Sequence, residues 1–262
     1  MQAAPASDWI DIPESDLQVM ETAGGGRVTI QLARDFAPIH VTNIRALAGK
    51  SWWDGTSINR VQDNYVVQWG DPTEKKALPA EIVAHPPEEY VRDLRSLKPK
   101  WSPWPDAYAK NTGFLDGWPV GSDGRAAWLV HCYGMVGVGR NMAPDTGSGA
   151  ELYAVIGHAP RHLDRNIALV GRVLEGMEFL ASRPRGTEAL GFYGDPQQRI
   201  RINSVRPMRE ADAGSKSAWQ YLSGGSFDRY REARANRRDP FFKIPAGGAD
   251  ICNIPVPVRR KP

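Results

Sequence analysis

Short strand-like runs separated by glycine- and proline-containing turns are the feature that most restricts the fold of this chain. In the clearest run, residues 27–33, apolar and polar residues alternate directly after Gly24-Gly25-Gly26, as in a strand with one buried face. The 26 Gly and 21 Pro favour many turns and short strands over long helices. Further strands are expected within 52–71, on either side of a turn at 62–64, and over 127–132, 152–156, 167–173 and 199–205.

Two segments between these runs are predicted to be helical. Pro38 opens an apolar stripe at helical spacing that ends at Gly49, and a second short helix is expected over 176–182. Short antiparallel strands flanked by only two helices indicate a closed barrel with covered ends. Residues 72–127 are rich in Pro, Trp and charge and are expected to form a long loop, with one short helix near 88–97.

Charge and hydropathy exclude several partners. The formal charge is +3, from 33 Lys and Arg against 30 Asp and Glu, so electrostatic steering toward nucleic acid is expected to be weak. No run approaches the roughly 20 apolar residues that would cross a bilayer, so no membrane insertion is expected. Basic residues in 227–239 alternate with acids, which favours a solvated helix over a phosphate- or membrane-binding one.

The N-terminus and the two cysteines bear on the cellular compartment. The opening Met1-Gln-Ala-Ala-Pro-Ala-Ser7 is typical of a mature periplasmic or secreted protein whose signal was removed; the alternative is a flexible cytoplasmic N-terminus. Cys132 and Cys252 lack metal-ligand spacing. They either form one disulfide, as an exported protein would allow, or remain two separate buried thiols.

Common enzyme signatures are missing from the sequence. It contains no Gly-x-Ser-x-Gly, no His-Glu-x-x-His and no phosphate-binding loop ending in Gly-Lys-Ser/Thr. Gly137-Val-Gly139 lacks the third glycine and the following helix of a dinucleotide-binding motif. Neither a metal nor a cofactor is therefore expected.

A series of separated blocks, in a fixed order, resembles the cyclophilin-type peptidyl-prolyl cis-trans isomerases. The resemblance covers 17–205 and is interrupted by the 72–127 insertion; residues 1–16 are expected to be a flexible N-terminus and 206–262 a C-terminal extension. The blocks are Gly26-Arg-Val-Thr-Ile-Gln-Leu-Ala-Arg-Asp-Phe-Ala-Pro38, Val41-Thr-Asn-Ile-Arg-Ala-Leu47, Asn59-Arg-Val61, Tyr65-Val-Val-Gln-Trp-Gly-Asp71, Gly134-Met-Val-Gly-Val-Gly-Arg-Asn-Met-Ala-Pro144, Gly149-Ala-Glu-Leu-Tyr153, His162-Leu-Asp164 and Val170-Gly-Arg-Val-Leu-Glu-Gly-Met177.

The resemblance implies a fold and an activity. The fold is a mainly β, closed, antiparallel eight-stranded barrel with two capping helices, to which the inserted loop and the C-terminal extension are added. The activity is cis-trans isomerisation of X-Pro bonds in proline-containing polypeptide clients, assisting their folding, without a cofactor. The sequence does not determine the oligomeric state, and a monomer is favoured. Arg60 matches the family's catalytic arginine; a guanidinium beside the prolyl nitrogen stabilises the twisted transition state more than either planar ground state.

The remaining site residues are also implied by the resemblance. Gln68 would bond to a substrate carbonyl, and the backbone near Arg140 and Asn141 would pair with the extended peptide as a strand does. Tyr65, Val66, Tyr153 and Leu163 would form the apolar socket for the proline ring, and Glu151 and His162 would complete the substrate-binding surface.

Several of these positions depart from the family pattern. Glu151 replaces a common Gln, His162 the Trp of drug-sensitive members, and Ile167 a His, so cyclosporin is expected to bind poorly. Val66 replaces the usual Met of the family, and Asn59 replaces a common His. These differences predict reduced or altered activity. One alternative is therefore a barrel that holds proline segments as a chaperone or scaffold without catalysis, and another is a structural protein that only decorates an assembly.

Overall fold

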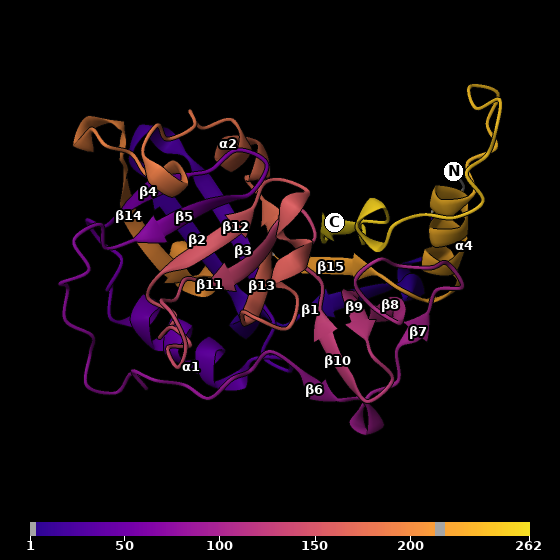
Figure 1. The fold of residues 1–262 in the computed structure, drawn as a ribbon, viewed down its shortest axis with the longest axis horizontal. Coiled ribbons are helices and arrows are strands. Elements are labelled where there is room, and N and C mark those ends of the chain that lie inside the picture. The colour runs from indigo at the N-terminus through magenta and orange to yellow at the C-terminus, as the bar shows by residue number, and fades with distance from the viewer. Residues whose placement is uncertain (1–3, 213–217) are drawn as a thin grey trace. The chain divides into compact units, whose positions relative to one another are not determined.

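A computed structural model describes residues 4–212 and 218–262 of the chain (Figure 1). The contacts within it separate two compact units. The larger comprises residues 14–91 and 131–212, and the smaller comprises residues 4–13, 92–130 and 218–262. None of the described helices is both long and apolar enough to cross a bilayer.

The larger unit is built around a closed barrel of eight strands. Neighbouring strands follow the order β11-β12-β5-β4-β14-β2-β3-β13, and every pairing is antiparallel. The prediction of a closed eight-stranded antiparallel barrel is therefore confirmed. Its strands are β2 (Leu17–Thr22), β3 (Arg27–Leu32), β4 (Ser57–Val61), β5 (Val66–Gly70), β11 (Met135–Val138), β12 (Leu152–Val155), β13 (Leu169–Glu175) and β14 (Ile200–Pro207).

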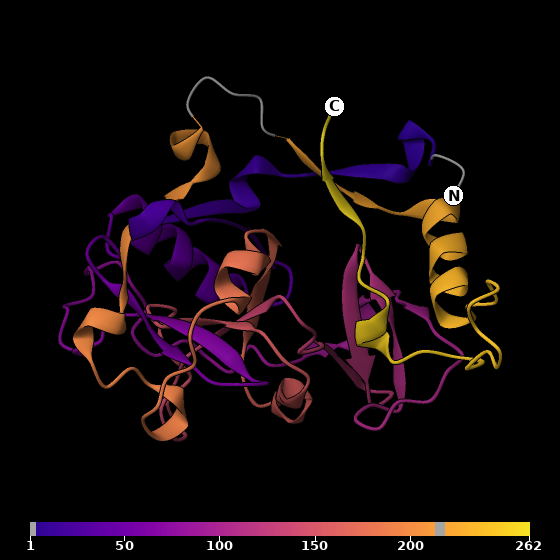
Figure 2. The same ribbon diagram turned by 90° about the horizontal axis from the view of Figure 1, so that it is seen from above.

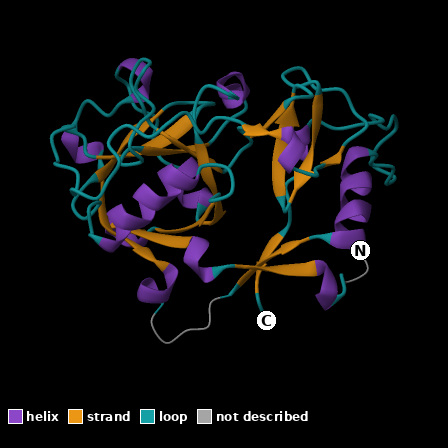
Figure 3. Cartoon of the chain, turned by 90° about the horizontal axis from the view of Figure 1, so that it is seen from below, coloured by secondary structure: helices purple, strands orange, loops and turns teal. Residues whose placement is uncertain are grey.

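Helices α1 (Pro38–Gly49) and α2 (Met177–Ala181) lie on opposite sides of the barrel in Figure 1. Both predicted bounds of α1 are correct, because Pro38 occupies its first turn and the apolar stripe ends where the helix ends. Val41, Ile44 and Leu47 are fully buried in the barrel core. Figure 3 views this side of the barrel and shows α1 lying across its opening. A further short helix, α3 (Met208–Ala211), follows β14.

A register shift in the barrel wall determines where the polar side chains of the site lie. Strands β4 and β5 pair Ile58 with Trp69 and then, after a bulge, Arg60 with Gln68. Ile58 and Trp69 are fully buried, whereas Arg60 and Gln68 are only partly buried. Bulges redirect side chains at barrel rims, and this one brings Arg60 directly opposite Gln68.

The smaller unit contains two sheets and a helix, α4 (Gly224–Ala235). A five-stranded sheet has the order β6-β10-β9-β8-β7, and a three-stranded sheet, β1-β15-β16, joins segments from both ends of the chain (Figure 2). The strands are β1 (Trp9–Ile12), β6 (Arg92–Asp93), β7 (Lys100–Trp101), β8 (Asn111–Leu115), β9 (Trp118–Ser122), β10 (Ala126–Leu129), β15 (Trp219–Leu222) and β16 (Val258–Arg260).

The structure of 92–129 differs from the loop expected there. Strands β7 to β10 form a sheet, and the expected helix near 88–97 is only a 3-10 turn, Leu94–Ser96. Asp116 and Gly117 join β8 to β9 with φ values of 48° and 77°, and Asp-Gly is the sequence preferred by such a two-residue hairpin. That signal was present in the sequence, but these short strands contain Gly and Pro and lack regular alternation.

The structure corrects the predictions for the N-terminus and for the bounds of the helix near the C-terminus, and it decides the state of the two cysteines. Residues 9–12 form strand β1, paired with β15, rather than a flexible tail; residues 1–3 lie outside the described part of the chain. The predicted basic helix begins and ends three to four residues earlier, as α4. Cys132 and Cys252 are both disulfide-bonded, so the alternative of two buried thiols is wrong.

Candidate active site

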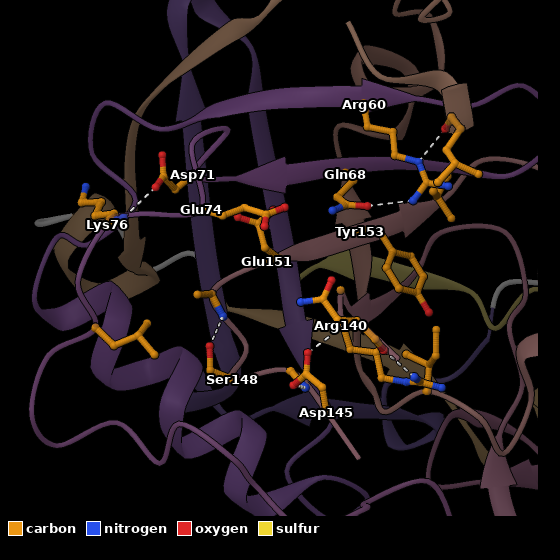
Figure 4. Close-up of a pocket in the computed structure, with 18 of the residues that line it drawn as sticks. Arg60, Gln68, Asp71, Glu74, Lys76, Arg140, Asp145, Ser148, Glu151 and Tyr153 are labelled. Atoms are coloured by element: carbon orange, nitrogen blue, oxygen red, sulfur yellow. Dashed lines mark hydrogen bonds between the residues drawn. The ribbon is translucent and has the colours of Figure 1, made fainter. Parts of the chain in front are cut away.

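A pocket of about 650 Å³ opens on the larger unit beside β4, β5 and β12 (Figure 4). All but one of the residues that the resemblance assigns to the site line it; the exception is His162. The lining residues from that set are Arg60, Tyr65, Val66, Gln68, Arg140, Asn141, Glu151, Tyr153 and Leu163.

Arg60 is held in place by three hydrogen bonds. Its Nη1 donates to Oε1 of Gln68 at 2.9 Å, its Nε donates to the carbonyl oxygen of Leu190 at 2.7 Å, and its Nη2 donates to Oε1 of Gln62. Burial lowers the pKa of the Arg60 guanidinium, and the nearby hydroxyl of Tyr65 opposes this shift. The guanidinium is therefore a partly desolvated cation with fixed orientation, and fixed donors of this kind can stabilise developing negative charge.

The apolar part of the pocket lies next to this cation. Val66 and Tyr153 are buried at 1% and 4% relative exposure, and Tyr65 and Leu163 are partly buried. The guanidinium carbon of Arg60 lies 5.8 Å from the centre of the Tyr65 ring. An apolar wall beside a fixed cation suits a proline ring whose nitrogen faces a hydrogen-bond donor.

Tyr153 is held from behind by a buried polar chain that the sequence analysis missed. Nε2 of His131 lies 2.9 Å from the Tyr153 hydroxyl, and Nδ1 of His131 lies 2.9 Å from Oδ1 of Asp164. Burial lowers the pKa of His131 despite Asp164. This favours a neutral ring that accepts a hydrogen bond from the Tyr153 hydroxyl through Nε2 and donates one to Asp164 through Nδ1. The Tyr153 hydroxyl therefore points into the protein.

Glu151 lies on the side of Gln68 that faces away from Arg60 (Figure 4). Burial raises the pKa of Glu151 to about 8; hydrogen bonds from the Gln68 side chain and the Asp71 backbone oppose this shift, while the charges of Glu74 and Asp71 add to it. Gln68 therefore links Arg60 to a carboxyl group that is protonated at neutral pH. Figure 4 shows Glu151 with Asp71 and Glu74 on one side of Gln68 and Arg60 on the other.

The loop at Arg140 and Asn141 is already bonded within the chain. The Asn141 backbone N–H donates to Oδ2 of Asp145 at 2.8 Å, and its carbonyl accepts from Nη1 of Arg140 at 2.7 Å. The Arg140 guanidinium also donates to the carbonyl of Asn166. A client strand that paired with Asn141 would therefore have to displace Asp145 and Arg140.

The positions that depart from the family pattern lie around the pocket. His162 is exposed and stacks on Tyr65, with ring centres 5.8 Å apart and Nε2 3.4 Å from the Tyr65 hydroxyl. Ile167 lines the pocket. Asn59 is buried behind it and lines a smaller cavity of about 80 Å³ with Gln68 and Glu151.

Replacing Gly137 with alanine is expected to disturb the pocket through Tyr153. A Cβ at this position would lie 2.3 Å from the Tyr153 ring, which cannot retreat because His131 holds its hydroxyl. We expect a loss of roughly 1–3 kcal/mol in unfolding free energy from overpacking and a roughly tenfold fall in kcat/KM from the displaced ring. Chemical denaturation and an isomerase assay would measure the two effects.

Gly49→Ala is the matched control for that prediction, because nothing lies within 4 Å of a Cβ there. It should leave both quantities nearly unchanged. If Gly137→Ala behaved like Gly49→Ala, Tyr153 would not be held as described.

Comparison with known proteins identifies the family. The sequence profile described as cyclophilin type peptidyl-prolyl cis-trans isomerase/CLD matches residues 17–206. The fold is similar to that of the cyclophilin AquaCyp293 from Hirschia baltica, with a TM-score of 0.75, 22% identity, and coverage of 99% of this chain and 98% of that one. A cyclophilin-type isomerase from Cryptosporidium parvum is less similar, with a TM-score of 0.48, 15% identity, and coverage of 73% and 96%.

A search of curated protein sequences gave no match. The profile match nevertheless spans most of the chain, and it includes every strand of the barrel except the last residue of β14. The site residues named above from the resemblance all lie within that match. The chain belongs to the cyclophilin-type peptidyl-prolyl cis-trans isomerase family.

Proposed function

We propose that this isomerase rotates X-Pro bonds by directing the Arg60 guanidinium at the prolyl nitrogen of a client held in the pocket. The observation that carries this proposal is a fixed, partly desolvated arginine beside an apolar socket in a pocket of about 650 Å³. Resonance gives the peptide C–N bond partial double-bond character and a rotation barrier near 20 kcal/mol. A donor to the nitrogen lone pair weakens that resonance as the bond twists.

The other pocket residues have supporting roles in this proposal. Tyr65, Val66, Tyr153 and Leu163 bind the proline ring by excluding water from it. Gln68 accepts from Arg60 through Oε1, and its Nε2 donates to a client carbonyl while the other end of the bond turns. Because Arg60 carries its charge at any working pH, the chemical step itself needs no proton transfer.

The clients would be extended, proline-containing segments of other polypeptides, bound by a monomer. Assistance to protein folding follows from the chemistry, because uncatalysed X-Pro isomerisation takes tens of seconds and limits the refolding of many chains. An exported, periplasmic location is supported by the disulfide-bonded state of Cys132 and Cys252, since disulfides persist mainly in oxidising compartments.

Exchange NMR on a short proline peptide, with and without the protein, tests the proposal directly. Catalysis predicts exchange cross-peaks between cis and trans resonances on a sub-second timescale at catalytic protein concentration. The same protein should shorten the proline-limited phase of a refolding client. Shifted peptide resonances without faster exchange would instead identify a proline-peptide-binding module and contradict the proposal.

A further inference from the structure

A tight turn beside Arg60, residues 186–193, is not part of the site that sequence analysis predicted. Its residue Leu190 has φ 59° and ψ 11°, a left-handed conformation that costs a β-carbon-bearing residue roughly 1–2 kcal/mol. Leu190 is nevertheless 64% exposed. A large apolar residue that is mostly exposed in a strained backbone position points to a role outside folding.

The turn, named here the Leu190 turn, is fixed to strand β4. The Gly186 N–H donates to the carbonyl of Val61 at 2.9 Å, and the Tyr193 N–H donates to the carbonyl of Asn59 at 3.0 Å. A Cβ on Gly191 would lie 2.7 Å from Cα of Gln62, so the turn packs against the strand with no space between. These contacts hold the Leu190 turn against β4, the strand that carries Arg60.

The Leu190 turn forms one wall of the pocket. The Leu190 carbonyl accepts from Nε of Arg60 at 2.7 Å, and the Phe192 ring centre lies 5.5 Å from the guanidinium carbon. Leu190 and Phe192 are both among the residues that line the pocket. Gln68 bonds to Nη1 of the same guanidinium, so Gln68 and the Leu190 turn engage different edges of Arg60.

This arrangement gives the two sides of a bound proline different surroundings. This inference rests on the proposed function and adds to it that Gln68 and the loop at Asn141 take the peptide segment that precedes the proline. Figure 4 shows Arg140, the neighbour of Asn141, and Arg60 on opposite sides of Tyr153. With that assignment, the Leu190 turn, on the Arg60 side of the pocket, is left for the segment that follows the proline.

We propose that Leu190 is a specificity-determining residue that contacts the client side chain immediately after the proline and favours a large apolar residue there. Leu190 and Phe192 present apolar surface on the rim, and burying such surface on both partners is favourable. The Leu190 carbonyl also accepts from Arg60, so the same residue positions the donor to the prolyl nitrogen and makes the apolar contact.

Exchange NMR with four peptides that differ only after the proline, carrying Leu, Phe, Ala or Glu, tests the inference. We expect kcat/KM to be about five- to tenfold higher for Leu and Phe than for Ala or Glu, within the range of discrimination by apolar pockets. Leu190→Asn should abolish the preference by raising KM for the Leu and Phe peptides about five- to tenfold more than KM for the Ala peptide. Asn tolerates the left-handed conformation, so the carbonyl bond to Arg60 is retained.

Ile10→Asn is the control for loss of exposed apolar surface, since Ile10 is 41% exposed in β1 and lies outside the pocket lining. It should keep the preference of the wild type. Equal rates for the four peptides, or a preference that survives Leu190→Asn, would overturn the inference while leaving the isomerase assignment intact. A uniform fall in kcat for Leu190→Asn would also overturn it, because that result assigns Leu190 only to holding Arg60. Absence of turnover for every peptide would instead refute the proposed function.

Discussion

Replacing Arg60 with alanine is expected to lower kcat/KM for proline isomerisation by about 100- to 1,000-fold, the cost of removing one preorganised transition-state donor. The loss should fall almost entirely on kcat, because the apolar socket of Val66, Tyr153 and Leu163 still binds the proline ring. Exchange NMR measures the rate, and titration of the same peptide into the variant measures binding. Affinity should stay within about threefold of the wild type.

Two controls show whether the lost rate comes from the planar guanidinium of Arg60 or from unfolding. Arg60→Lys retains a positive charge but not the planar donors that reach Gln68 and Leu190 together, so it should recover little of the lost rate. Thermal unfolding should show that Arg60→Ala costs only about 1–2 kcal/mol, the value of a few partly buried hydrogen bonds. An alanine variant that is folded and turns over like the wild type would contradict the role given to Arg60.

Glu151→Gln is expected to change how stability depends on pH. The pKa of Glu151 is raised to about 8, first by burial, from an ordinary value of 4.5. Between these two values the folded protein holds a proton that the unfolded chain releases. The contribution of Glu151 to the stability of the folded state is therefore fully present below about pH 4.5. It declines as the pH rises and is lost once the pH passes about 8.

Because Gln does not titrate, the variant should lose this dependence and become more stable relative to the wild type as pH rises. The difference in unfolding free energy between the two proteins should shift by roughly 3–5 kcal/mol between pH 5 and pH 9. Urea denaturation at several pH values measures it, and taking the difference cancels the histidines common to both proteins. Parallel pH profiles would show that Glu151 is ionised throughout this range.

Glu74→Gln provides the matched control. Glu74 is exposed and acts on Glu151 only through its charge, so its removal should lower the pKa of Glu151 slightly and leave the slope in place. A change as large as that of Glu151→Gln would place the titrating group at Glu74 instead.

The sequence by itself determined the features that depend on neighbouring residues. Alternation predicted β3, the turn at 62–64 predicted β5 after it, and the Pro38 to Gly49 stripe predicted both ends of α1. The order of the blocks identified the barrel and its family. These signals are local, because burial on one face imposes a period of two on a strand and about 3.6 on a helix. The site residues were named from family resemblance, and the structure brings nearly all of them to one pocket.

The tertiary structure decided what depends on residues far apart in the chain. Arg60 meets Leu190 across 130 positions, and His131 links Asp164 to the hydroxyl of Tyr153. The sheet formed by 92–129 likewise comes from pairing between short strands that have little pattern of their own. The periodicity of the sequence does not predict such contacts. They arise from strand register and from buried hydrogen bonds, which form only when the whole barrel and sheet have assembled.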